Sequence, residues 1–193
     1  MSRLHYFVVG GKWMSILDSL KRVKKQLIAN QHPLAEQSIE FRKTYAVGYA
    51  LLICVNGHPS EIAKDIFRKQ VVQLDLPESS YKEALQTALN ATEETIHGVL
   101  KILNEPIVKY IFMLDLYCLA QQDHKMTEKE QEIIVLFEEL LQLSYVEIQF
   151  IRGFRLAILK NDNELAVKVV QTAIDQAVNV PQKELSFFLE TCD

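Results

Sequence analysis

Glycine, proline and cysteine are all scarce in this 193-residue chain, and the scarcity narrows the fold class. There are six Gly and five Pro residues, too few for the many tight turns of a β-rich protein. The three cysteines, at 54, 118 and 192, are far apart and form no Cys-x-x-Cys pair, which argues against a structural zinc site. Their odd number, and the apolar surroundings of the first two, predict reduced thiols in a cytoplasmic protein.

Long apolar runs and catalytic motifs are also missing. The longest apolar candidate, residues 46–55, is about half the length that a membrane-spanning helix needs, and the N-terminus lacks the layout of a secretory signal. No P-loop, nucleophile elbow or His-Glu-x-x-His motif is present, so we expect no enzymatic activity. Asp115 lies in an apolar segment and is expected to pair with a neighbour such as Lys109 or Lys125.

Charge is present, but it is divided unevenly along the chain. Residues 1–43 contain eight Lys and Arg against three Asp and Glu, whereas the remainder contains thirteen against twenty-two. An acidic body does not suit the phosphate backbone of a nucleic acid, so we expect no nucleic-acid partner. The basic part could contact an acidic protein, lipid headgroups or the body itself, and the sequence leaves these alternatives open.

The first 30 residues divide into two segments. Residues 1–12 form a β-like apolar run without an evident partner strand, which predicts a flexible or loosely docked extension, unless translation begins at Met14. Residues 13–30 have apolar residues at helical spacing and basic residues around them, which predicts a basic amphipathic helix. This helix either packs on the body or contacts a membrane surface or partner, using Trp13, Lys21, Arg22, Lys24 and Lys25.

From residue 31 onward, helical periodicity and capping residues mark one helix after another. Pro33 suits the first turn of a helix over 34–54, and Ser60 can cap the next one. Together these signals predict an all-α domain over 31–193, a compact bundle of about eight to ten helices. Three pairs have capping-box spacing: Ser80 with Glu83, Thr127 with Glu130, and Ser144 with Glu147.

One helical arrangement occurs twice, within residues 45–90 and 109–160. When Ser60 is placed over Thr127, the Leu-x-Leu segments at 74–76 and 141–143 coincide. Each copy then reads as an apolar helix, a short polar loop and a capped amphipathic helix, and a short loop makes its two helices pack as a hairpin. We therefore predict two pseudo-repeated helical hairpins that arose by duplication, with Leu141 in the core.

The second copy, DLYCLAQQDHKMTEKEQEIIVLFEELLQLSYVEI, resembles the TerB-like domains, a bacterial family named for a tellurite-resistance protein. Asp123 stands at the family's loop-aspartate position, Thr127 at its helix cap and Glu130 at its acidic first-turn position. The first copy departs from the pattern because Asn56 replaces the aspartate, and the second copy has His124 in place of the loop glycine. The resemblance covers residues 45–175.

The resemblance implies a non-enzymatic module of stress-response or tellurite-resistance systems, which binds a protein partner in the cytoplasm or at the inner face of the membrane. It also implies that the loops take up divalent cations such as calcium, and no other cofactor is expected. The alternative hypothesis is therefore a divalent-metal or small-ligand site at Asn56, His58, Asp123 and Glu130. Calcium usually takes six to eight oxygen ligands, whereas the imidazole of His58 suits a borderline metal such as zinc better. The competing interpretation is that all four residues are helix caps or loop residues that face the solvent.

Overall fold

The computed structural model describes residues 7–9, 12–14, 31–121 and 126–191 of the chain. Near the N-terminus it contains a short hairpin in which β1 (Phe7–Val9) pairs antiparallel with β2 (Lys12–Met14). The apolar run therefore has a partner strand, and Trp13 lies in that strand, opposite Val8. The remaining residues of the predicted basic surface, Lys21, Arg22, Lys24 and Lys25, lie outside the described residues.

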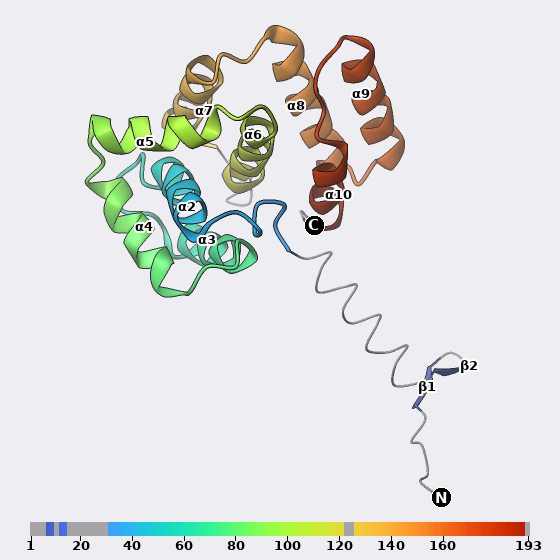
Figure 1. The fold of residues 1–193 in the computed structure, drawn as a ribbon, viewed down its shortest axis with the longest axis horizontal. Coiled ribbons are helices and arrows are strands. Elements are labelled where there is room, and N and C mark those ends of the chain that lie inside the picture. Colours follow the sequence, from blue (N-terminus) through green and yellow to red (C-terminus); the bar gives the residue numbers. More distant parts are fainter. Residues whose placement is uncertain (1–6, 10–11, 15–30, 122–125, 192–193) are drawn as a thin grey trace, which may run out of the picture.

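The rest of the described chain is helical, which confirms the predicted all-α class for the body (Figure 1). Successive helices are joined by short connections, as the predicted caps and breakers require. The helices are α2 (Ile39–Ile53), α3 (Glu61–Gln73), α4 (Ser79–Leu89), α5 (Glu93–Leu103), α6 (Pro106–Gln121), α7 (Glu128–Leu140), α8 (Tyr145–Leu159), α9 (Asn163–Asp175) and α10 (Gln182–Thr191).

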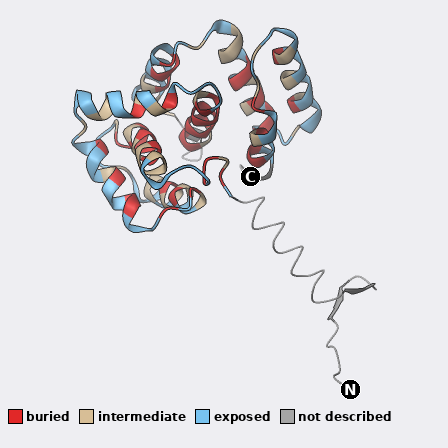
Figure 2. Ribbon diagram, viewed as in Figure 1, coloured by how far each residue is buried: buried red, intermediate tan, exposed pale blue. Residues whose placement is uncertain are grey.

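Helix α6 is the centre of the bundle. It contacts α2, α3, α5, α7 and α8, and almost every residue from Val108 to Ala120 is buried (Figure 2). Its sequence is apolar on all sides rather than along one stripe, and such a helix is stable in water only when other helices surround it. The helices α8 and α9 pack together beyond it, with α10 beside them (Figure 1).

Most helices begin at the cap that the sequence predicts. Ser60 Oγ accepts a hydrogen bond from Ala63 N at the start of α3, and α7 and α8 begin with the predicted capping boxes at Thr127 and Ser144. Helix α2 is shorter than predicted: the chain forms turns after Pro33, and the helix starts only where Ser38 Oγ accepts from Phe41 N.

Helix α4 does not have the predicted cap. It begins at Ser79 after Glu78, which makes no side-chain cap bond. The Ser80 side chain is buried, and Glu83 instead accepts a bond from Lys43 Nζ of α2 at 3.2 Å. The packing of α4 on α2 therefore takes both residues away from the capping role that their spacing indicates.

Helices α3 and α7 have the same length and the same C-terminal geometry. Each ends before a residue in the left-handed region, Asp75 with φ 53° and Gln142 with φ 50°. Two residues after each helix C-cap, a leucine amide bonds back into the last turn, Leu76 N to Val71 O at 3.2 Å and Leu143 N to Glu138 O at 3.0 Å. This is the Schellman type of helix end. It leaves the C-cap residues Leu74 and Leu141 buried in the core, as predicted for Leu141.

Candidate functional site

The polar loop that follows α2 contacts the start of α7. Asn56 follows α2, and its Nδ2 donates to Thr127 Oγ1, the cap of α7, at 3.1 Å. Thr127 Oγ1 also accepts from Glu130 N at 3.2 Å. The Asn56 loop is therefore held against the first turn of α7, the neighbourhood in which a metal site was predicted.

Of the other three predicted metal ligands, one completes a helix cap, one is exposed and one lies outside the described residues. Glu130 Oε2 accepts from Thr127 N at 2.7 Å and Thr127 Oγ1 at 3.0 Å, so this carboxylate completes the capping box. His58 is exposed, and Asp123 lies outside the described residues. Within the ranges that the structure describes, no group of three His, Cys, Asp or Glu side chains is placed to hold a metal ion.

A buried polar network that the sequence did not predict lies at the heart of the bundle. Asp115 of α6 pairs with neither Lys109 nor, among the described residues, any other lysine. Its Oδ2 lies 2.9 Å from His32 Nε2 and accepts from Tyr45 OH of α2 at 2.7 Å. His32 is 4%, Tyr45 0% and Asp115 5% exposed. Burial, and then the charge of Asp115, raise the pKa of Tyr45, which keeps its hydroxyl a donor.

The neighbours of His32 define what this network can do. Leu34 N donates to His32 Nδ1 at 3.1 Å, so Nε2 carries the ring proton and donates it to Asp115. Neither ring nitrogen is left to take a proton from a substrate. The Phe187 ring of α10 also packs edge-on to the imidazole, with centroids 5.3 Å apart. The network therefore fastens the segment before α2 to α2, α6 and α10 and has a structural role.

A second buried carboxylate joins α7 to α6 and α8. Glu138 is 5% exposed, accepts from Tyr117 OH at 2.7 Å, and forms an ion pair with Arg152 Nη2 at 2.9 Å. Burial and the hydrogen bond to Glu138 raise the pKa of Tyr117 to about 12. The Arg155 guanidinium lies over the Tyr117 ring, 4.8 Å from its centroid, so charge and aromatic contacts together lock these three helices.

A third carboxylate, Glu147, caps α8 and also pairs with α6. Its Oε2 accepts from Ser144 N at 2.7 Å, while Oε1 accepts from Lys109 Nζ at 2.6 Å and from Tyr110 OH. Burial alone would raise the pKa of Glu147, but the bonds from Lys109, Tyr110 and Ser144 outweigh it and lower the pKa to about 2. This carboxylate is therefore charged at neutral pH and stabilises the α6–α8 contact.

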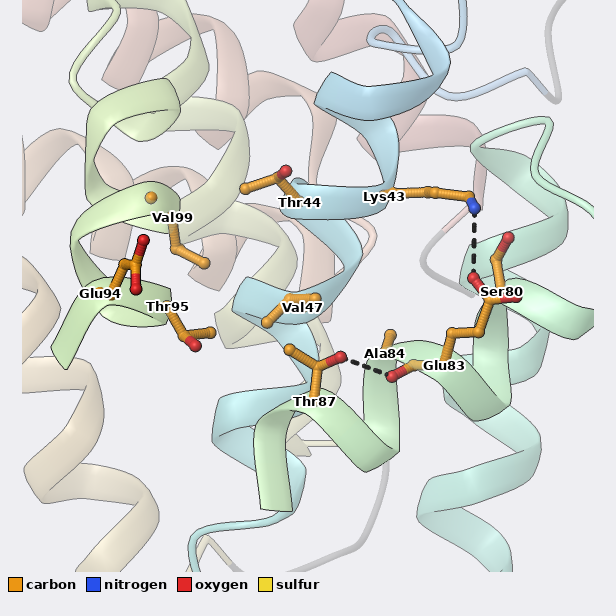
Figure 3. A pocket seen from close by; sticks show the side chains of 11 residues that line it. Lys43, Thr44, Val47, Ser80, Glu83, Ala84, Thr87, Glu94, Thr95 and Val99 are labelled. Carbon is orange, nitrogen blue, oxygen red and sulfur yellow. Dashed lines mark hydrogen bonds and ion pairs between the residues drawn. The ribbon is translucent and has the colours of Figure 1, made fainter. Parts of the chain in front are cut away.

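The open surface between α2, α4 and α5 forms a groove of about 300 Å³ (Figure 3). Val47, Ala84 and Val99 give it an apolar lining, and polar side chains of all three helices surround them. Unlike the three networks around Asp115, Glu138 and Glu147, this groove has room for another molecule. Sequence periodicity did not indicate it, because its walls come from three separate helices.

Comparisons with known proteins add no identification. The chain matches no protein-family model, no curated protein and no solved structure. None of the helices in the described ranges is long and apolar enough to cross a membrane.

Proposed function

We propose that this chain is a TerB-like helical module without catalytic activity that binds a protein partner in a bacterial stress-response or tellurite-resistance system. The observation that carries the proposal is a set of three exposed apolar side chains at the C-terminal half of α7 and the start of α8: Leu136 and Leu140, about one helical turn apart on α7, and Tyr145, the first residue of α8. These side chains are 46%, 47% and 76% exposed. We call them the α7–α8 face.

The composition of the α7–α8 face suits a protein partner. Large apolar side chains that gather on a surface gain free energy when a partner covers them, at about 25 cal/mol per Å² of apolar area. Tyrosine is among the residues that contribute most at interfaces, because it combines a large ring with a polar tip. Glu132 and Glu139 are exposed on the same helix and provide the polar rim that interfaces of this kind have.

Substitution of the face tests the proposal. We expect Leu136→Ser combined with Tyr145→Ser to abolish co-purification of a specific partner from the native cells, while circular dichroism stays unchanged. The matched control is Ile62→Ser combined with Val167→Ser, because these residues are 62% and 69% exposed on α3 and α9. Equal loss of the partner in both double variants, or retention in both, would contradict the proposal.

Equal spacings between helices of the two predicted hairpins support the TerB-like part of the proposal. Helix α2 (39–53) and helix α6 (106–121) start 67 positions apart, as do α3 (61–73) and α7 (128–140). The residues in left-handed conformation that follow α3 and α7, Asp75 and Gln142, have the same separation. We infer that the two hairpins descend from one ancestral unit, and this register also places Asn56 over Asp123.

The proposed location is the cytoplasm, and the basic sequence of residues 13–30 supports the alternative of contact with the inner face of the membrane. Sedimentation with anionic liposomes at low salt tests it, because electrostatic attraction to such surfaces is screened by salt. We expect the chain to sediment with the liposomes at low salt and to be released at high salt. Failure to sediment at low salt would contradict membrane contact without affecting the α7–α8 face.

A second candidate function, divalent-cation binding, is favoured by the contact between Asn56 and Thr127. Through this contact Asn56 lies beside the cap of α7, and the remaining ligands would have to come from Asp123 and from water. Calorimetric titration with calcium, zinc and manganese tests it, with Asn56→Asp as the variant expected to bind more tightly. Absence of heat for all three metals in both proteins would exclude this function.

A further inference from the structure

We propose that the groove between α2, α4 and α5 binds a small alkyl amine, with its hydrocarbon part on the groove floor and its ammonium group at the carboxylate rim. Figure 3 shows Glu94 and Thr95 of α5 on one side, Thr87 and Glu83 of α4 on the other, and Val47 of α2 between them. The groove volume of about 300 Å³ suits a molecule of this size. The three helices that form it are held together by their own packing.

The polar groups of the groove favour a hydrogen-bond donor with positive charge. Thr44 Oγ1 and Thr87 Oγ1 already donate to the carbonyl oxygens of Glu40 and Glu83, each at 2.9 Å, so both hydroxyl oxygens can only accept further bonds. Lys43 is the one cationic side chain in the described lining, and it is paired with Glu83 at 3.2 Å.

Of the two carboxylates in the described lining, Glu83 is paired with Lys43 and Glu94 is not, so an ammonium ion would bind beside Glu94. Glu94 is exposed and takes part in no ion pair of the described structure. Lys43 and Glu83 neutralise each other, so the lining carries one net negative charge. A carboxylate ligand would be repelled at this rim, and an uncharged alcohol would gain no electrostatic attraction there.

Ser80 is a buried polar residue of the lining, on α4 beside the Lys43–Glu83 pair (Figure 3). It lines the groove, is 2% exposed, and its Oγ has no hydrogen-bond partner among the described residues. A buried hydroxyl without a partner is unfavourable, and native structures normally satisfy such groups.

The floor of the groove explains the alkyl part of the ligand. Val47, Ala84 and Val99 line it, and Gly98 of α5 leaves the wall open, because a Cβ added there would meet no atom within 4 Å. A larger side chain at position 98 would therefore extend into the groove without displacing the protein. Gly98→Leu is thus a variant that closes the site and leaves the fold intact.

The experiment is an NMR titration of the full chain with hexylamine, and with hexanoate and hexanol as ligands of the same length. We expect hexylamine to produce saturable shifts of the amides lining the groove at low-millimolar concentration, about the range for so small a ligand. Hexanoate should produce none, and hexanol should bind at least about fivefold more weakly, since it lacks the charge that Glu94 attracts.

Two pairs of measurements decide whether the binding occurs in the groove. Glu94→Gln should weaken hexylamine binding about fivefold or more, whereas Glu93→Gln, an equal charge loss on the neighbouring residue outside the lining, should leave it unchanged. Gly98→Leu should remove binding while its melting temperature stays at or above that of the parent chain. The proposal is overturned if hexylamine and hexanoate bind alike, if Glu93→Gln matches Glu94→Gln, or if Gly98→Leu still binds.

Discussion

Glu147 is a single carboxylate that serves two helices, and its contacts lower its pKa. It completes the cap of α8 and accepts hydrogen bonds from Lys109 and Tyr110 of α6. Those bonds require the charged form. The stability of the α6–α8 contact should therefore follow the ionisation of this one residue.

The pH dependence has a definite sign. The pKa of Glu147 is lowered from an ordinary 4.5 to about 2 on folding, so the unfolded chain binds a proton before the folded one does. Its stabilising contribution is fully present above about pH 4.5 and is lost as the pH falls toward 2. In urea unfolding, the difference in unfolding free energy between the parent and Glu147→Gln should be large at pH 6 and shrink below about pH 4.5.

Exposed Glu164 in the first turn of α9 provides the control for this measurement, because it makes no ion pair with the described residues. Glu164→Gln should show nearly the same unfolding free energy as the parent from pH 6 to about pH 2. A Glu147→Gln effect that does not change with pH would contradict the assigned ion pair.

Asp115 of α6 holds both His32, in the segment before α2, and Tyr45 of α2. We therefore expect substitution of Asp115 to lower the free energy of unfolding. Asp115→Ala leaves the His32 Nε2–H and the Tyr45 hydroxyl buried without an acceptor, at a cost of about 1–3 kcal/mol for each donor. Asp115→Asn keeps one acceptor oxygen and should cost less. Denaturant unfolding measures both variants, with Tyr49→Phe as a control, since its hydroxyl makes only a long 3.4 Å contact. Equal stability of Asp115→Ala and the parent would rule out the network.

At the scale of the helix, residues that are adjacent in sequence can have opposite environments. Leu141 is 3% exposed and Leu140 is 47% exposed, because the end of α7 turns one inward and the other outward. We expect Leu141→Ala to lower the unfolding free energy by about 2–5 kcal/mol and Leu140→Ala to change it by less than about 0.5 kcal/mol. Urea melts of the two variants would refute the core assignment if their losses were equal.

Helix starts show how far local sequence determines an element. The capping boxes at Thr127 and Ser144 form as predicted, because a cap is a bond between residues three positions apart. Ser80 fails as a cap because α4 packs on α2 and buries it, and Lys43 takes up the Glu83 carboxylate. The predicted start of α2 at residue 34 was too early, because Pro33 suits a turn as well as the first turn of a helix, and the helix begins at Ile39.

At the scale of the whole molecule, the sequence predicted the helical class but not the contacts that assemble it. Helical periodicity is a local property, so the buried character of α6 could be read from its composition. The pairing of His32 with Asp115 joins residues 83 positions apart, and no local pattern contains that information. His32 also lies in an irregular segment, where periodicity gives no signal. The hydrogen bond between Asn56 and Thr127 joins residues 71 positions apart and is likewise absent from any local pattern.

The central position of α6 leads to a prediction about unfolding. Local opening occurs where few apolar contacts hold an element. Helix α6 is surrounded by five helices, whereas α9 packs mainly on α8 and fully buries only Ala166 and Ala173. We therefore expect α6 amides to exchange hydrogen only through global unfolding and α9 amides to exchange earlier, through local opening. Native-state hydrogen exchange in increasing urea measures this order, and α9 amides as strongly protected as those of α6 would show that the helices unfold as one unit.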